Sequence, residues 1–149
     1  MARHPRWARR FMSVADLDAV ARAVAEAERL TSAEIRLHLD HRCAGDAMQR
    51  AIEVFERLGM HRTAERHGVL IYVAVADRKL AVIGDAGIHE RVGEAYWRKL
   101  VAAVTRHFGE ERPRDGFIHA IAELGQVLRR HFPRRPDDTN ERPDDVGIG

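Results

Sequence analysis

The most strongly apolar stretch of the chain runs from Val69 to Val75, and every residue in it is hydrophobic. It is too short to cross a membrane, and it is bounded by Gly68 and by a polar turn around Asp77. An unbroken apolar run of this length, rich in β-branched residues, is typical of a strand buried on both faces. The residues Lys79–Ile83 predict a second strand, which returns antiparallel after the turn.

Residues 34–40 alternate between polar and apolar side chains, the pattern of a strand with one buried and one solvated face. We expect this strand to lie nearer an edge of the sheet than the strand at 69–75. Because a helical pattern separates the two, they should pair in parallel through a right-handed crossover. The returning hairpin strand then makes the sheet mixed.

Apolar residues recur at helical spacing in four stretches, each preceded by a capping residue or ended by a glycine or proline. The predicted helices cover residues 13–30, 46–58, 88–107 and 115–132. The fold class is therefore α/β, with a small mixed sheet of three to four strands sandwiched by about four α-helices.

A chain of 149 residues has the size of one domain, which we expect to span residues 13–133. Residues 1–12 contain four arginines and no acid and form a basic N-terminal arm. Its Trp7 and Phe11 either rest on acidic lipid or a partner, or belong to a frayed terminus, which the shortness of the arm favours. Residues 134–149 have little apolar content and predict an acidic flexible tail, disordered or draped on the surface.

The net charge of +2 belongs to the arm, because the body between arm and tail holds 18 basic and 18 acidic residues. We therefore expect no nucleic-acid partner. Cys43 is the single cysteine, which excludes an internal disulfide and a cysteine-based zinc site. No apolar run is long enough for a transmembrane segment, and no signal peptide is recognisable, so the protein is expected to be cytoplasmic.

The expected topology gathers acidic residues at one end of the sheet. Glu34 opens its strand at the end where Gly68 enters, and Asp85 follows the returning strand to that same end. Two carboxylates, with loop carbonyls or with Thr63 and Glu65 of the preceding connection, would suit Ca²⁺ or Mg²⁺. The alternative is that Asp85 caps the next helix and that Glu34 pairs with an arginine.

Asp40 and Asp77 meet at the opposite end by the same reasoning and form a secondary acidic cluster. The alternative there is a turn aspartate beside a strand-end aspartate. His38 and His41 are the closest histidine pair but have no obvious third ligand, so we interpret them as solvent-facing. The common nucleotide, hydrolase and metalloprotease motifs are absent, and the catalytic residues, if there are any, are unknown.

The chain resembles the TPM-domain family over roughly Leu30–Pro133, in a small soluble bacterial branch. The similar stretches are TSAEIRLHLD, LGMHRTAERHGVLIYVAVADRKLAVIGDAGIHERVGEAYW and GFIHAIAELGQVLRRHFP. Their more specific elements are AEI, T-x-x-R-x-G-V-L-I-Y, A-D-R-K and I-G-D-x-G-I. The resemblance implies an α/β sandwich, a small mixed sheet between helices.

The resemblance also implies two functions, since some family members bind calcium and a plant member associated with photosystem repair gives the family its phosphatase label. We expect a Ca²⁺-binding accessory or interaction module with a protein partner, at a membrane or in a stress response. The alternative is a divalent-metal-dependent phosphatase acting on phosphomonoesters, with Glu34 and Asp85 holding the metal and Arg66 and Arg91 as phosphate clamps. His67 stands where the family commonly has asparagine, beside this site.

Overall fold

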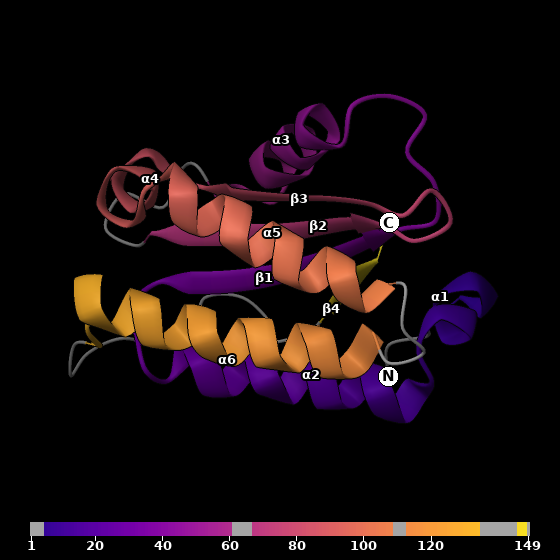
Figure 1. Ribbon diagram of the computed structural model, residues 1–149, viewed down its shortest axis with the longest axis horizontal. Coiled ribbons are helices and arrows are strands. Elements are labelled where there is room, and N and C mark those ends of the chain that lie inside the picture. Colours follow the sequence, from indigo (N-terminus) through magenta and orange to yellow (C-terminus); the bar gives the residue numbers. More distant parts are fainter. Residues whose placement is uncertain (1–4, 61–66, 109–112, 135–145, 149) are drawn as a thin grey trace.

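The protein is built in three layers, with α3 (Ala47–Arg57) on one face of a mixed sheet and α2 (Val14–Glu28) and α6 (Pro113–His131) on the other (Figure 1). A computed structural model describes residues 5–60, 67–108, 113–134 and 146–148. The described helices are α1 (Arg6–Phe11), α2 (Val14–Glu28), α3 (Ala47–Arg57), α4 (Ala86–Val92), α5 (Glu94–Phe108) and α6 (Pro113–His131). The described strands are β1 (Glu34–Asp40), β2 (Gly68–Ala74), β3 (Lys79–Gly84) and β4 (Val146–Ile148).

The strand order in the sheet is β3-β2-β1-β4. β1 pairs in parallel with β2 and with β4, whereas β2 and β3 pair antiparallel. This confirms the predicted fold class and the predicted crossover and hairpin. The starts of β1 and β2 therefore share one rim with the end of β3, and the carboxyl ends of β1 and β2 share the opposite rim with the hairpin turn.

β2 is buried on both faces, as its unbroken apolar run predicts. Val69, Ile71 and Val73 belong to the large core formed with the helices of one layer, and Leu70 and Tyr72 belong to the smaller core under α3. Alternate residues of a strand point to opposite faces, so one seven-residue strand supplies both cores.

The prediction of a solvated face on β1 is wrong. Glu34, His38 and Asp40 are all buried, with 4 to 5% of their surface exposed. β1 is an inner strand, because β4 pairs along its outer edge and α3 lies over the sheet on the polar side. His38 is consequently not the solvent-facing histidine that the sequence indicated.

The N-terminal arm is folded rather than frayed over its described part. Ala8 and Met12 are buried, and Trp7 and Phe11 pack against the large core. These four apolar residues recur at helical spacing, so one side of α1 attaches the arm to the domain.

The end of the tail also differs from the prediction. Val146–Ile148 form β4, which pairs with Leu37, His38 and Leu39 of β1, so a flexible tail is wrong for these three residues. The backbone of β1 offers hydrogen bonds on both sides, and a short apolar segment can take them up. Residues 135–145 lie outside the described residues.

The single helix expected over residues 88–107 is divided into α4 and α5. Gly93 separates them with a φ of +86°, a backbone conformation that favours glycine. Within the described residues, no helix is both long enough and apolar enough to cross a membrane.

Candidate functional site

Glu34 and Asp85, two of the residues predicted from the sequence to bind a cation, both lie at the rim where β1 and β2 start. The Glu34 N–H donates to the His67 carbonyl at 2.7 Å, and the Asp85 N–H donates to the Gly68 carbonyl at 3.0 Å. The backbones of Glu34 and Asp85 therefore lie on either side of the His67-Gly68 segment. Thr63, Glu65 and Arg66 lie outside the described residues.

The Asp85 carboxylate accepts hydrogen bonds from three donors. It caps α4 by accepting from the Ile88 N–H at 3.0 Å, and it accepts from the Gly68 N–H at 2.8 Å. His67 Nδ1 lies 3.0 and 3.2 Å from its two oxygens. The capping role considered as the alternative is thus present, together with two further bonds that tie the start of β2 to the end of β3.

His67 is held in place by its neighbours on three sides. Its ring lies 4.4 Å from the ring of Phe132, and Asp85 holds Nδ1. A Cβ atom at Gly87 would lie 2.4 Å from His67 Cε1, so only glycine fits at position 87 beside this imidazole. The guanidinium of Arg91 lies 5.9 Å from the centre of the Phe132 ring, a cation–π contact at the predicted phosphate clamp.

The described residues of this rim do not by themselves complete a cation cage. Glu34 is buried, and the Asp85 oxygens already accept hydrogen bonds. Among the residues that the structure describes, no three histidine, cysteine, aspartate or glutamate side chains lie close enough together to hold a metal ion. An ion at this rim would need further ligands and would compete with His67 for Asp85.

At the opposite rim, Asp40 is the centre of a buried polar cluster. One of its oxygens accepts hydrogen bonds from Arg50 Nε at 2.9 Å and from the Tyr72 hydroxyl at 2.6 Å. Its other oxygen lies 3.2 Å from His38 Nε2. β1, β2 and α3 each supply one partner, so this cluster joins the sheet to α3.

Burial and hydrogen bonding fix the charges in this cluster. Burial lowers the pKa of His38 below its ordinary 6.5, although the Asp40 carboxylate acts in the opposite direction. Burial alone would raise the pKa of Asp40, but hydrogen bonds from Arg50 and Tyr72 outweigh it and keep the pKa below the ordinary 3.8. Burial, with Asp40 beside it, raises the pKa of Tyr72, which therefore stays a hydrogen-bond donor.

Asp77 binds different partners from Asp40, although both lie at this rim. Its carboxylate accepts from the Cys43 N–H at 2.7 Å and lies 3.6 Å from Arg42. Lys79 Nζ donates to the carbonyls of Cys43 and Gly45 at 2.9 and 2.8 Å. An ammonium group thus occupies carbonyl oxygens of the kind that a metal ion would use.

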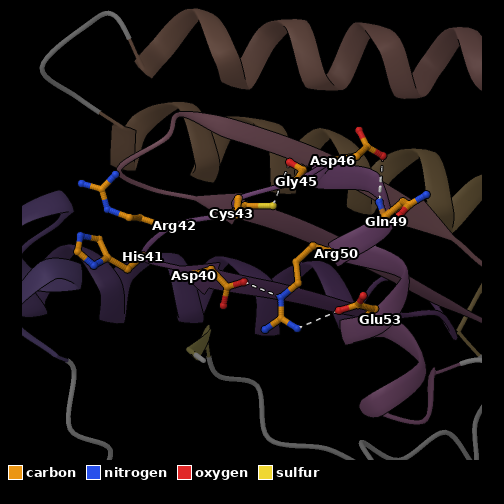
Figure 2. A pocket seen from close by; sticks show the side chains of 10 residues that line it. Asp40, His41, Arg42, Cys43, Gly45, Asp46, Gln49, Arg50 and Glu53 are labelled. Atoms are coloured by element: carbon orange, nitrogen blue, oxygen red, sulfur yellow. Dashed lines mark hydrogen bonds and ion pairs between the residues drawn. The ribbon is translucent and has the colours of Figure 1, made fainter.

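A polar pocket of about 510 Å³ opens at this rim, between the end of β1, the loop of residues 41–46 and the first two turns of α3 (Figure 2). Ligands commonly bind outside the carboxyl ends of parallel strands in α/β sheets. Figure 2 shows the Arg50 side chain reaching from Asp40 to Glu53, while Asp46 turns to the Gln49 N–H that it caps. The charges that line the pocket are largely paired with one another.

The sequence predicts Asp40 at this rim, whereas the contribution of α3 was not predicted. Asp46, Gln49, Arg50 and Glu53 recur at spacings of three and four residues, so they form a polar stripe on the helix that follows Asp40. That stripe is readable in the sequence. The partner of Arg50 is not, because it depends on how α3 packs over the sheet.

A second hollow, of about 650 Å³, lies along β3 and is mainly apolar. Leu80 and Val82 of β3, Trp97 and Val101 of α5 and Met48 of α3 contribute to its walls. Met48 is one of the few large apolar residues with a substantially exposed surface. This apolar groove is a surface on which a partner can pack.

The fold and its two polar rims define a small three-layer α/β domain around a four-stranded mixed sheet. A comparison with protein families matches residues 8–127 to the TPM domain. The match covers most of the chain, and the chain belongs to the TPM-domain family.

Two solved structures are similar to this chain. The BA42 protein of the psychrophilic bacterium Bizionia argentinensis has 35% sequence identity and a TM-score of 0.82, over 91% of this chain and 93% of that one. The N-terminal domain of cg2496 from Corynebacterium glutamicum has 12% identity and a TM-score of 0.62, over 86% of each chain, and shares the fold alone. No curated protein matches the chain.

Proposed function

We propose that this TPM-domain protein is a non-catalytic interaction module that binds a divalent cation, Ca²⁺ or Mg²⁺, at the rim of Glu34 and Asp85. The observation that supports a non-catalytic role is that the aspartates at both rims already accept hydrogen bonds from other parts of the protein. Asp85 accepts from Ile88, Gly68 and His67, and Asp40 is bound by Arg50 and Tyr72. A carboxylate that accepts several hydrogen bonds from the protein has a structural role and is less available to position a metal-bound water for catalysis.

The alternative, a metal-dependent phosphatase, needs a phosphate clamp and an acid for the leaving group besides the metal. The Arg91 guanidinium lies against Phe132 on the exposed side of α4, and Arg66 lies outside the described residues. Tyr72 donates to Asp40 from a buried position, which removes it as an acid for a substrate in solvent. These contacts favour the interaction module over the enzyme.

Cation binding remains a proposal that the nearness of Glu34 and Asp85 supports. Since His67 Nδ1 takes up lone pairs of Asp85, an incoming ion has to displace the imidazole, which weakens its binding. Replacing His67 by the smaller asparagine, the residue common in the family, would release Asp85. We expect His67→Asn to bind Ca²⁺ more tightly than the wild type.

Calorimetric titration of the metal-stripped protein with Ca²⁺ and with Mg²⁺ tests this. Asp85→Asn keeps an oxygen that can cap α4 but removes the charge, so it should weaken binding about tenfold or more. Asp18→Asn removes an exposed charge on α2 and is the matched control, with unchanged affinity expected. Absence of any binding heat in both the wild type and His67→Asn would end the cation proposal.

A steady-state assay with p-nitrophenyl phosphate separates the two functions. We expect no turnover above the background of Asp85→Asn, with or without Ca²⁺ or Mg²⁺. Phosphatase activity that persists through purification and disappears in Asp85→Asn would favour the enzyme instead.

The partner of the module is proposed to be a protein, for which the apolar groove along β3 offers a contact surface. The cytoplasmic location, expected from the lone cysteine, stays a prediction.

A further inference from the structure

Three segments from different parts of the chain meet at the rim formed by the carboxyl ends of β1 and β2. They are α1, the loop of residues 41–46 and the hairpin turn of residues 75–78, and Figure 1 shows α1 and the hairpin turn at the same end of the molecule. The Trp7 ring stacks on His41 at 5.3 Å, nearly parallel to it. Asp77 binds the Cys43 N–H and lies near Arg42, which joins the turn to the loop.

The way α1 packs leaves its arginines in solvent. Its apolar side is used up within the protein, since Trp7 stacks on His41 and Phe11 meets Phe117 edge to face at 6.1 Å. Arg6, Arg9 and Arg10 lie on the outer side and are exposed. In the described part of the chain, these three guanidinium groups have no carboxylate within salt-bridge distance.

The two neighbouring segments add further positive charge. Arg78 is exposed at the tip of the hairpin turn, and the Arg42 side chain is 71% exposed, with only a long 3.6 Å contact to Asp77. Asp77 is half-buried, and Asp46, the exposed acid of these segments, turns toward Gln49 at the start of α3 (Figure 2). In these three segments five exposed arginines therefore outnumber the two acids, although the body of the chain is neutral as a whole. Asp16 and Asp115 lie near Arg10, but both are paired with Arg114.

We propose that this basic end, defined by Arg6, Arg9, Arg10, Arg42 and Arg78, docks on the surface of an anionic lipid bilayer. A bilayer is a broad charged surface, which can meet a short helix and two loop tips at the same time. Guanidinium groups pair well with lipid phosphates, and attraction grows with each arginine near the surface. The proposal names a surface for the interaction module and rests on that proposed function.

A nucleic acid fits this end less well. Binding of single strands uses aromatic rings on which bases stack, but Trp7 and Phe11 already pack against His41 and Phe117. α1 has six residues and a length of about 9 Å, too short to follow a groove of a duplex. The basic end therefore matches a charged surface rather than a base-reading site.

Co-sedimentation with phosphatidylcholine vesicles that contain about one-third phosphatidylglycerol tests the proposal, with EDTA present so that no divalent ion takes part. The test variant is Arg6→Gln/Arg9→Gln/Arg10→Gln, which we call the α1 variant. The matched control, Arg98→Gln/Arg129→Gln/Arg130→Gln, removes the same charge from exposed positions of α5 and α6. A second variant, Arg42→Gln/Arg78→Gln, which we call the loop variant, leaves α1 intact.

We expect the wild type and the control to bind anionic vesicles equally within about twofold and to be released by added salt. The α1 variant should bind about tenfold more weakly or worse, and the loop variant should also bind more weakly than the control. Circular dichroism melting shows whether each variant has folded. If the α1 variant has not folded, the binding of the loop variant tests the proposal in its place.

Equal loss of binding in the α1 variant and the control would overturn the proposal, because it would show a general charge effect. Equal binding to neutral vesicles, or tighter binding to a single-stranded or duplex oligonucleotide than to anionic vesicles, would overturn it as well. If vesicle binding fails while the calorimetric Ca²⁺ binding is retained, only the bilayer proposal falls and the cation-binding module stands.

Discussion

His38 and Asp40 lie two residues apart on β1, and the fold lowers the pKa of both side chains. Because their ordinary pKa values differ, the two side chains affect the stability of the protein in different pH ranges. The unfolded chain protonates His38 below its ordinary pKa of 6.5, while burial keeps it neutral in the folded protein. Its contribution is therefore complete above that pH and is lost as the pH falls below it. Asp40 contributes above its ordinary 3.8 and loses its contribution only in more acidic solution.

We therefore predict that the free energy of unfolding falls as the pH drops below about 6.5, with His38 contributing a slope of up to about 1.4 kcal/mol per pH unit. His38→Gln should show a smaller fall over that range. Urea denaturation followed by circular dichroism at a series of pH values measures both slopes. His89→Gln, at an exposed position of α4, should keep the wild-type slope. Equal slopes for the wild type and His38→Gln would contradict the assignment.

Two glycines determine how helices end and pack, for different physical reasons. Gly93 ends α4 with φ +86° and ψ 153°, and a Cβ atom there would have no atom within 4 Å. Gly125 lies in α6 against α2, where a Cβ atom would lie only 2.9 Å from the Cβ of Ala27. The first glycine is needed for its backbone and the second for its small size.

Replacing either glycine by alanine should lower the stability of the protein, but a second substitution, Ala27→Gly, should offset the loss only at Gly125. Gly93→Ala places a side chain in a region open almost only to glycine and should cost about 1–3 kcal/mol. Gly125→Ala overpacks the α2–α6 contact and should cost a similar amount, about 1–3 kcal/mol. Adding Ala27→Gly should restore much of the loss in Gly125→Ala, while its effect on Gly93→Ala should be additive. Denaturation midpoints of the three single variants and the two double variants measure these effects, and rescue of Gly93→Ala by Ala27→Gly would refute the distinction.

Across the whole molecule, β4 completes the sheet at the edge where β1 would otherwise be open. β4 pairs with the middle of β1, which carries Leu37 and Leu39 of the large core. An uncovered edge next to a buried strand can pair with another chain and aggregate. The C-terminal end of the sequence therefore contributes to the fold through its backbone.

A chain that ends at residue 145 lacks β4 and is predicted to unfold at a lower temperature and to aggregate at lower concentration. Calorimetric melting and light scattering at several protein concentrations measure the two effects. A chain that lacks only Gly149, beyond the strand, should behave like the wild type. If removal of residues 146–149 changes neither melting nor scattering, β4 has no stabilising role.

Much of the fold could be predicted because its signals are local. The apolar run of β2, the stripe of Leu17, Val20 and Val24 in α2, and the caps at Ser13 and Asp46 each act within a few residues of the chain. The errors concern elements whose structure depends on distant partners. Trp7 is ordered by His41, and the strand at Val146 is ordered by β1.

The candidate site was predictable in position but less so in its contacts. The topology placed Glu34 near Asp85 and Asp40 near Asp77, and the structure has these pairs at common rims. It could not decide what each carboxylate binds. The donors to Asp85 come from the His67-Gly68 segment and from α4, and those to Asp40 come from β2 and α3, so their meeting requires the assembled fold.

By itself, the sequence determined the α/β class, the parallel crossover with its hairpin, and the rims at which the acidic residues gather. Period, capping and chain connectivity fix these features before any distant contact forms. Only the tertiary structure decided that the polar side of β1 is buried, that α1 packs on the core and that β4 pairs with the sheet. It also decided that the His67 imidazole lies within hydrogen-bond distance of the Asp85 carboxylate. The reason is physical: a buried polar group is stable only with its hydrogen-bond partners, and packing brings those partners from elsewhere in the chain.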